Sequence, residues 1–559
     1  MSRPRRHRFR RFVAPLLVVL AILVLMMFAV AWLPLRDARD AFRRGEDRVA
    51  IAQAERWSRL HLWPAAYHQL LAAAYLTSSD EAQARKHLDA LRSGRVWMPA
   101  ISKTDVARRL FALRRYAEFL DYDGASYELR ETPNVRLYRA AALTALNRIN
   151  EADTIARTVD RGAVDAKKLT ALQSSIALRR GGSYPLVIDR NGGAIANYRA
   201  SDQQLVSVDS RFSTIVDKTA GSLTFGALLP TLGANDTIET TLDPAVQQAA
   251  LTALGTFRGA IVAIDPRTNE LLAIASSRGE NLAIEHQYEP GSIIKVLTGL
   301  NALNRGVNVK FPYHCSGDLL IDGRHFGDWM TQGHGDLATF DDAFAQSCNI
   351  VFADIGLRLG VDQLRNFMTA AGFDGQTNLG LFQAPLGKII PPIFNRYETA
   401  YVAIGLEHES VNALHVAILA SMMANRGVLT QPRLLRNRRS ILGEVLTSPP
   451  AQGSTRIASA EAAEEMVHAM IAVATSERGT GRRAPVEGMT IALKTGTAGS
   501  KANGKLQALI LAFAPADHPK IAFGIIAEDA GPAEFAGAKI AHDFLAAITK
   551  TPAGARAPH

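Results

Sequence analysis

The sequence predicts a chain in three structural parts: one transmembrane helix, an all-α region and an α+β region. Three observations support this division. Residues 12–35 contain no charged side chain, residues 36–180 are rich in Ala, Leu and Arg but poor in Gly, and residues 241–550 alternate strand-like and helix-like apolar segments. At about 100–200 residues per domain, a chain of 559 residues is long enough for three or four folded units.

The positive charge of the chain is concentrated at its N-terminus. Six arginines precede residue 12, whereas the whole chain has 63 basic and 53 acidic side chains and a net charge of +10. A basic body would suggest a nucleic-acid partner, but the body of this chain is nearly balanced. The hydrophobic content of 48% also excludes a largely disordered chain. We therefore expect a basic cytoplasmic tail over residues 1–11 and no nucleic-acid partner.

The first long apolar segment runs from Phe12 to Leu35 and has the length of a membrane anchor. Its 24 residues can cross a hydrocarbon core of about 30 Å. By the positive-inside rule, the preceding arginines place the N-terminus in the cytoplasm and the rest of the chain outside it. The alternative is a cleaved signal peptide ending near Ala31, but its apolar stretch would exceed the usual 7–15 residues. The sequence thus predicts a single-pass protein of the inner membrane.

Residues 36–180 read as successive helices with a weak repeat. The pairs Glu81-Ala82, Tyr116-Ala117 and Glu151-Ala152 each begin a helix-like stretch, and their alanines are 35 residues apart. Small residues would let adjacent helices pack closely, and a period near 34 is similar to that of tetratricopeptide arrays. The full signature of that repeat is absent. The segment is either a docking platform or a plain helical spacer, and the pattern does not separate the two.

A small β-containing linker module is expected over residues 181–240. Gly181-Gly182 ends the helical region, and residues 185–198 read as two short strands around an Asn191-Gly192 turn. After this module, Asp243-Pro244 is a typical helix start. Residues 259–265 and 271–277 then predict two adjacent buried strands.

Ser292 and Lys295 form a Ser-x-x-Lys spacing at the beginning of an apolar helix. Residues three apart on a helix are neighbours, so the lysine amine can reach the serine hydroxyl. A serine becomes a good nucleophile when a nearby base takes its proton, and a lysine can act as that base if burial or another cation lowers its pKa. Taken alone, this short motif is common by chance and usually belongs to a surface helix.

Two further motifs follow in a specific order. Ser347-Cys348-Asn349 lies within the helix-like stretch 343–352, and Lys494-Thr495-Gly496-Thr497 lies at the end of the strand-like stretch 489–493. Each triplet by itself is a weak signal. Together with Ser292 and Lys295, they match the three-motif set of penicillin-recognising serine enzymes.

Residues 241–550 resemble the transpeptidase domain of penicillin-binding proteins. The segment Tyr288–Val296 looks like the family's nucleophile segment, and Asp328-Trp329 and Gly333-His334-Gly335 are similar to elongation-type class B members. The resemblance implies an antiparallel five-stranded sheet flanked by helices, an all-α subdomain, no cofactor and no metal. Residues 551–559 are expected to form a flexible tail.

The resemblance also implies a role for each motif residue. Ser292 is expected to be the acylated nucleophile, and Lys295 to take its proton. Ser347 is expected to relay protons between the lysines. Asn349 is expected to hold the peptide amide of the substrate.

The third motif is expected to bind the substrate carboxylate. Lys494 should keep Lys295 neutral through its own charge, and Thr495 should bind the carboxylate directly. Gly496 belongs to the same binding strand. The backbone N–H groups of Ser292 and Thr497 should form the oxyanion hole, in which one donor contributes about 3–4 kcal/mol to lowering the barrier.

The implied function is that of a D,D-transpeptidase. Such an enzyme cross-links peptidoglycan stem peptides through an acyl-enzyme and is acylated by β-lactam antibiotics. One alternative is a D,D-carboxypeptidase or β-lactamase that uses the same serine with water as the acceptor. A second alternative is a non-catalytic scaffold that recruits cell-wall synthesis proteins through residues 36–180.

Cys315, Cys348 and His334 are left outside these roles. Free cysteines are commonly small buried side chains, so we favour that interpretation of Cys348 over a redox function or pairing with Cys315. Two cysteines are too few for a multi-cysteine metal site. His334 has no acid partner or ligand spacing in the sequence, so we expect it to be structural.

Overall fold

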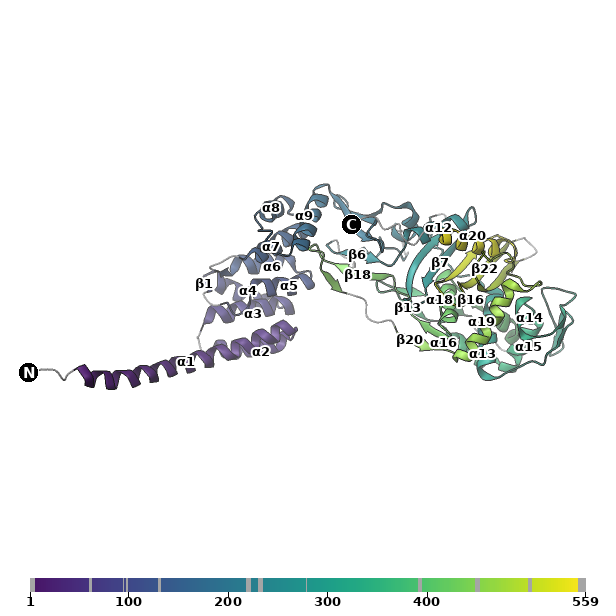
Figure 1. Ribbon diagram of the computed structural model, residues 1–559, viewed down its shortest axis with the longest axis horizontal. Coiled ribbons are helices and arrows are strands. Elements are labelled where there is room, and N and C mark those ends of the chain that lie inside the picture. The colour runs from purple at the N-terminus through teal and green to yellow at the C-terminus, as the bar shows by residue number, and fades with distance from the viewer. Residues whose placement is uncertain are drawn as a thin grey trace, which may run out of the picture. The chain divides into compact units, whose positions relative to one another are not determined.

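The computed structural model describes residues 6–550 except 60–62, 94, 97–98, 129–131, 218–222, 230–234, 278, 391–394, 448–452 and 501–504. The chain divides into two compact units (Figure 1). The first contains residues 1–184 and 439–446, and the second contains residues 185–438 and 447–559. The first five residues of the basic tail and the predicted tail over 551–559 lie outside the described residues.

The first unit begins with helix α1 (Arg6–Arg44), which contains all of the predicted membrane anchor. Many side chains of that segment, those of residues 12–14, 16, 24–25 and 27–31, lie outside the described ones. Within the described residues, no helix combines the length and the apolar character that crossing a bilayer requires. The anchor over 12–35 therefore stays a prediction.

Shorter helices form the rest of the first unit, and most of them pack against their neighbours in sequence. They are α2 (Asp47–Ser58), α3 (Pro64–Ser78), α4 (Glu81–Arg92), α5 (Lys103–Ala112), α6 (Tyr116–Ala125), α7 (Pro133–Ala145), α8 (Ile149–Ala156) and α9 (Ala166–Arg180). Helix α4, by contrast, packs against α3 and α6. Two-residue strands β1 (Arg95–Val96) and β2 (Tyr127–Glu128) pair between them. Their core includes the buried rings of Tyr67, Phe111 and Tyr138. The prediction of an all-helical segment is confirmed apart from this short strand pair.

The predicted repeat is only partly reflected in the packing. Helices α4, α6 and α8 start at or near the predicted positions. Ala152 is fully buried, but Ala82 and Ala117 are exposed, so the packing role predicted for these two alanines is wrong. The reason is that the buried side of α4 begins only at Ala84, and in α6 the buried side carries Tyr116 and Phe119, which leaves Ala117 on the exposed side.

A distant segment of the sequence completes the helical unit. Ile441 and Leu442 are buried in its hydrophobic core. Glu444 Oε1 lies 2.5 Å from Lys168 Nζ and accepts a 3.4 Å hydrogen bond from the Tyr138 hydroxyl. Residues 439–446, which connect strands β18 and β19, are thus an integral part of the first unit.

The second unit begins with a six-stranded sheet in the order β19-β18-β6-β3-β4-β5. The strands are β3 (Ser183–Ile188), β4 (Ala194–Arg199), β5 (Gln204–Ser207), β6 (Thr237–Thr240), β18 (Leu435–Arg439) and β19 (Val445–Thr447). The predicted strand pair around Asn191-Gly192 corresponds to β3 and β4. Residues 181–240 supply four of the strands, and β18 and β19 come from far downstream.

The central sheet is antiparallel and five-stranded, as the family resemblance implied. Its order is β21-β22-β23-β7-β8. The strands are β7 (Gly259–Asp265), β8 (Glu270–Ser276), β21 (Ala492–Ser500), β22 (Lys505–Ala514) and β23 (Ile521–Ala527). Every residue of β7, β8 and β23 is buried, which explains why these strands read as continuous apolar runs.

Helices cover both faces of the central sheet (Figure 1). Helices α12 (Pro244–Leu254) and α20 (Ala536–Lys550) contact each other and one face, and α18 (Ala413–Ala424) contacts the other. Asp243 caps α12 by accepting from the N–H of Ala245, which confirms the predicted helix start. Gly524 permits the close approach of α18, because a Cβ there would lie 2.6 Å from the carbonyl oxygen of Ala413.

Except for the short α10 (Ser213–Val216), the remaining helices form the predicted all-α subdomain, in which α13 contacts α15, α17 and α19, and α14 contacts α19. Its helices are α13 (Lys295–Arg305), α14 (Phe340–Ala345), α15 (Asn349–Leu359), α16 (Val361–Ala370), α17 (Arg396–Ile404) and α19 (Ala460–Thr475). Short paired strands lie around it: β9 (Tyr313–Cys315) with β12 (Gly335–Leu337), β10 (Asp318–Ile321) with β11 (Arg324–Gly327), β13 (Gln376–Asn378) with β14 (Gln383–Pro385), β15 (Lys388–Ile389) with β16 (Glu409–Ser410), and β17 (Val428–Thr430) with β20 (Ser454–Arg456). The α+β prediction is therefore confirmed.

Candidate active site

Ser292 lies in the short 3-10 helix η2 (Gly291–Ile294), directly before α13 begins at Lys295. Its side chain is half-buried and lines a cavity. The tight approach of this turn to strand β21 requires glycine at position 291. Gly291 has a φ of +56°, and a Cβ there would lie 2.6 Å from the carbonyl oxygen of Thr497. The backbone of the Ser292 turn is thus held against the strand that carries the third motif.

Ser347 lies between two helices. The sequence predicted one helix through residues 343–352, but α14 ends at Ala345 and α15 begins at Asn349. The prediction is wrong because Ser347 adopts a left-handed φ of +57°, which a continuous right-handed helix does not allow. Left-handed backbone at a serine is uncommon and is often found at functional sites. The break turns Ser347 and Asn349 toward the same cavity.

The third motif lies inside a strand. Strand β21 starts at Ala492, so Lys494 and Thr495 follow its first residues, and the predicted position at a strand end is wrong. Its pairing with β22 continues through the motif and places Thr495 opposite Ile510. Gly496 permits contact with the nucleophile turn, because a Cβ there would lie 2.7 Å from the carbonyl oxygen of Pro290.

The two lysines and Ser347 form a continuous chain of hydrogen bonds. Lys494 Nζ donates to Ser347 Oγ at 2.9 Å, and Lys295 Nζ lies 3.3 Å from the same oxygen. Lys295 Nζ also donates to the Ser347 carbonyl at 2.7 Å and to Asn349 Oδ1 at 2.6 Å. Both ammonium groups are fully buried. Four of the five predicted catalytic residues therefore form one hydrogen-bonded cluster beside the cavity that Ser292 lines: Lys295, Ser347, Asn349 and Lys494.

Burial lowers the pKa of both lysines. It brings the pKa of Lys295 to about 8 against the opposing negative charge of Asp328. It lowers the pKa of Lys494 far below the usual lysine range, and the charge of Lys295 lowers it further. Two charged amines sharing one hydroxyl are unfavourable, so the pair readily exists with one neutral amine. The prediction that Lys295 is the neutral partner and Lys494 the charged one stays a prediction.

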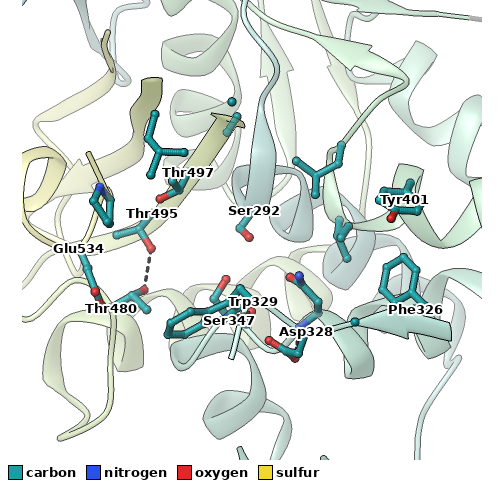
Figure 2. Close-up of a pocket in the computed structure, with 18 residues that line it drawn as sticks. Ser292, Phe326, Asp328, Trp329, Ser347, Tyr401, Thr480, Thr495, Thr497 and Glu534 are labelled. Atoms are coloured by element: carbon teal, nitrogen blue, oxygen red, sulfur yellow. Dashed lines mark hydrogen bonds between the residues drawn. The ribbon is translucent and has the colours of Figure 1, made fainter. Parts of the chain in front are cut away.

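The cavity has a volume of about 540 Å³ and has two chemically different ends (Figure 2). Thr480, Thr495 and Glu534 lie at one end, and the rings of Phe326 and Tyr401 lie at the other. Those rings are 5.0 Å apart between centroids, in an edge-to-face arrangement. Ser292 and Ser347 lie between the two ends. The predicted oxyanion residues Ser292 and Thr497 both line this cavity.

Several lining residues were not identified from the sequence. Thr480 and Thr495 share a hydrogen bond between their hydroxyls at 2.6 Å. Leu406 and Glu534 line the cavity from loops. Thr480, Leu406 and Glu534 belong to no motif, and nothing in their local sequence marks them. Only the fold places them beside Ser292.

Asp328 and Trp329 support the second motif through hydrogen bonds to its backbone. Trp329 Nε1 donates to the Ser347 carbonyl at 3.2 Å. Asp328 Oδ2 accepts from the backbone N–H of Asn349 at 2.9 Å, at the start of α15. Burial raises the pKa of Asp328, but the hydrogen bond from His334 and the charge of Lys295 outweigh it and bring the pKa to about 2. The sequence showed these residues only as part of the resemblance.

The structure changes the interpretation of His334. Its Nε2 lies 3.3 Å from Asp328 Oδ1, so the expectation that it has no acid partner is wrong. The sequence spacing hid this pair because the partner is six residues away across a turn. The ring also lies 5.5 Å from that of Trp329. Both contacts support a structural role.

Cys315 and Cys348 are buried free thiols next to Asp328. Their sulfur atoms are 3.1 Å apart. With a carboxylate oxygen of Asp328, they form the one group of potential metal ligands found within the described residues, with all ligand atoms within 4.8 Å of one another. Thiolates and carboxylates are zinc ligands. The sequence predicted no metal because two cysteines are too few for a multi-cysteine site, and it did not show that Asp328 lies beside them.

A comparison with family models matches residues 259–550 to the transpeptidase domain of penicillin-binding proteins. Among curated proteins, the chain is 29% identical over 340 residues to the peptidoglycan D,D-transpeptidase PbpA of Mycolicibacterium smegmatis. It is 30% identical over 356 residues to the peptidoglycan D,D-transpeptidase MrdA of Acinetobacter baumannii. These alignments cover 53% and 54% of this chain, but 67% of PbpA and only 52% of MrdA.

Solved structures show the same fold. The D,D-transpeptidase domain of a peptidoglycan glycosyltransferase from Eggerthella lenta has a TM-score of 0.58 at 23% identity, covering 66% of this chain and 98% of that one. The imipenem acyl-enzyme of penicillin-binding protein A from M. tuberculosis has a TM-score of 0.59 at 21% identity, covering 67% of this chain and 100% of that one.

Proposed function

Because the chain belongs to the penicillin-binding protein transpeptidase family, we propose that it is a peptidoglycan D,D-transpeptidase that works through an acyl-enzyme on Ser292. The observation that carries the proposal is the hydrogen-bond chain from Lys295 through Ser347 to Lys494 beside the cavity that Ser292 lines. Relatives named peptidoglycan D,D-transpeptidases support the same substrate class.

In the first half-reaction, Ser292 Oγ attacks the carbonyl carbon of the penultimate D-alanine of a stem peptide. Its proton passes to the neutral amine of the Lys295–Lys494 pair, with Ser347 Oγ as the relay between the two. The backbone N–H groups of Ser292 and Thr497 stabilise the oxyanion. The C–N bond then breaks, the proton goes to the leaving nitrogen, and D-alanine departs.

In the second half-reaction, an amine of another stem peptide attacks the ester carbonyl. A new C–N bond forms, the ester C–O bond breaks, and one amine proton returns to Ser292 Oγ through the same relay. A β-lactam follows the first half-reaction only. Opening of its ring leaves the acyl group on Ser292.

Fluorescent penicillin tests this proposal directly. The wild type should be labelled, and the Ser292→Ala variant should not. Equal labelling of both proteins would disprove the nucleophile assignment. Incubation of labelled protein with a stem-peptide amine separates the transpeptidase from the carboxypeptidase or β-lactamase alternative, which requires rapid loss of the label to water alone.

A non-catalytic scaffold remains the other alternative. It requires no chemistry at Ser292, whereas both lysines and Ser347 here form the complete hydrogen-bond chain. For the helical unit we propose docking of cell-wall synthesis proteins. Its exposed apolar side chains Leu113, Leu146 and Leu178 offer contact points. Replacing all three by Glu should abolish co-purification with such partners while penicillin labelling persists; undiminished co-purification would contradict the docking role.

We also propose that α1 anchors the protein in the cytoplasmic membrane. The second unit, which carries Ser292 and is therefore called the catalytic unit, is then exported. The uncharged run over 12–35 and the exposed apolar side chains of α1 support this location. Those exposed side chains are Leu17, Val18, Val19, Leu20, Ile22, Leu23, Met26 and Leu33. Their positions cover all sides of the helix, as in a helix surrounded by lipid. Fractionation tests the proposal: the full chain should stay in carbonate-washed membranes, and release by carbonate would refute it.

A further inference from the structure

Glu534 is an acidic side chain of the active-site cavity that the reaction described above does not use. It follows strand β23 in the loop that leads to α20, and it lines the same cavity as Ser292. It belongs to none of the three motifs. Figure 2 shows it at the end of the cavity that Thr480 and Thr495 form.

The loop that carries Glu534 is fixed on both sides. The Ala533 N–H donates to Thr497 Oγ1 at 3.0 Å, which ties the loop to strand β21. The Phe535 N–H donates to the Pro532 carbonyl at 3.1 Å. The guanidinium carbon of Arg483 lies 4.5 Å from the ring centroid of Phe535, a favourable cation–π contact. Glu534 is therefore held at a defined place between two anchored neighbours.

Glu534 is also available to a ligand. Its carboxylate has no hydrogen-bond or ion-pair partner in the part of the chain that the structure describes. The other acid that lines the cavity, Asp328, has a fully buried side chain and is engaged by the N–H of Asn349. A half-buried carboxylate without a partner attracts a cationic group, and a charge-assisted hydrogen bond is stronger than a neutral one.

The chemistry of the substrate indicates which cation this is. In the donor peptide, the nitrogen of the terminal residue is a neutral amide beside a free carboxylate. An acceptor that attacks the acyl-enzyme must bring a free amine, which is protonated in neutral solution. If that amine lies on the same carbon as a carboxylate, the group carries both charges. The hydroxyl pair of Thr480 and Thr495 then faces the carboxylate, and Glu534 faces the ammonium.

We propose that Glu534, Thr480 and Thr495 form the acceptor subsite, and that the acceptor is an amino-acid centre with a free amine beside a carboxylate. This inference rests on the proposed transpeptidase function. The bound ammonium first loses one proton to water. The amine then forms the new C–N bond while the ester C–O bond breaks, and its second proton passes through Ser347 and the lysine pair to Ser292 Oγ. Glu534 acts as a binding and positioning residue.

The test uses the full-length protein in detergent and a soluble stem-peptide analogue with a terminal D-lactate ester as donor. D-Alanine serves as the acceptor that has both charges, and D-alaninamide as the acceptor that lacks the carboxylate. Mass spectrometry separates the transfer product from the hydrolysis product. The wild type should favour D-alanine over D-alaninamide.

Glu534→Gln should raise the KM for D-alanine about tenfold, with a smaller change in kcat, because one charge-assisted contact is lost. The same variant should accelerate acylation by the donor about twofold, because the negative charge of Glu534 no longer repels the terminal carboxylate of the donor. Glu534→Asp should restore part of the D-alanine affinity. Asp517→Asn removes an exposed acid outside the cavity and is the matched control.

The outcomes are distinct. Unchanged transfer to D-alanine in Glu534→Gln, an equal fall in acylation and transfer, or a selective loss of hydrolysis would each overturn the acceptor assignment while the transpeptidase function stands. A wild type that is acylated and hydrolyses the donor but transfers to no amine would remove the transpeptidase function and the acceptor subsite with it.

Discussion

The carboxylate of Asp328 accepts a 2.9 Å hydrogen bond from the backbone N–H of Asn349, the first residue of α15. Negative charge at a helix N-terminus is favourable. The same Asp328 side chain contacts His334 and lies near Lys295. One buried acid thereby fixes the backbone that positions Ser347 and Asn349 in the site.

Replacing this acid should impair acylation without removing any catalytic group. We expect Asp328→Asn to lower the free energy of unfolding by about 2–3 kcal/mol, because buried hydrogen bonds lose an acceptor. Penicillin acylation should slow at least tenfold, as the second motif loses its support. Stopped-flow acylation and thermal unfolding measure the two effects. Asp336→Asn is the control, since that side chain is 81% exposed, and equal behaviour of the two variants would argue against the positioning role.

The rate of acylation should depend on pH through the lysine pair. The expected base is Lys295, and burial brings its pKa to about 8, so its amine is mostly charged below that pH and cannot accept the Ser292 proton. The second-order rate constant of penicillin acylation should therefore rise with pH, reach half of its maximum at about pH 8 and level off above about pH 9. Unfolding temperatures across the same range serve as the control. A rate that stays constant from about pH 6 to about pH 9 would contradict a neutral-amine base.

The contact between the nucleophile turn and β21 can be tested with two glycines of similar backbone conformation. Gly291 and Gly488 have φ values of +56° and +74°, but only a Cβ at 291 would meet Thr497, at 2.6 Å. Gly488→Ala should cost about 1 kcal/mol through backbone strain alone and keep penicillin labelling. Gly291→Ala should cost more and abolish labelling. Labelling of both variants at wild-type rates would show that the close approach is not required.

The segment 439–446 should contribute to the stability of the helical unit. Leu442 is 2% exposed, so Leu442→Ala should lower the free energy of unfolding of that unit by about 3 kcal/mol through cavity formation. Val445 is 48% exposed, and Val445→Ala should change the free energy of unfolding of that unit by less than about 0.5 kcal/mol. Limited proteolysis followed by mass spectrometry reports cleavage within residues 36–180. If Leu442→Ala left that cleavage rate unchanged, the segment would not be part of the core.

Local patterns were sufficient to predict much of the catalytic unit. Apolar runs around turns predicted β7 and β8. The three short motifs identified Lys295, Ser347 and Lys494, which share hydrogen bonds, and Ser292, which lines the cavity beside them. These features depend on residues close in sequence, or on a family resemblance. The α-helical region was predicted in the same way, from composition and the absence of glycine.

The remaining features depend on contacts between distant segments. The left-handed backbone at Ser347 breaks a helix that composition alone favours. Thr480 and Glu534 reach the cavity from loops whose place is set by the packing of β21 and α20. Strand β18 joins β6 although about 195 residues separate them, since a strand's partner is chosen by the whole sheet.

The place of residues 439–446 also determines how the protein can be dissected. Because this segment belongs to the helical unit while residues 185–438 and 447–559 belong to the other unit, the polypeptide passes between the units at three points of the sequence. Removing residues 36–180 alone would take away the helices against which Ile441 and Leu442 pack. It would leave an exposed apolar loop that is prone to aggregate. A variant that lacks the helical unit must therefore also have residues 439–446 replaced by a short polar turn. If a deletion of 36–180 keeps this segment, its loss of function can result from aggregation as well as from lost docking.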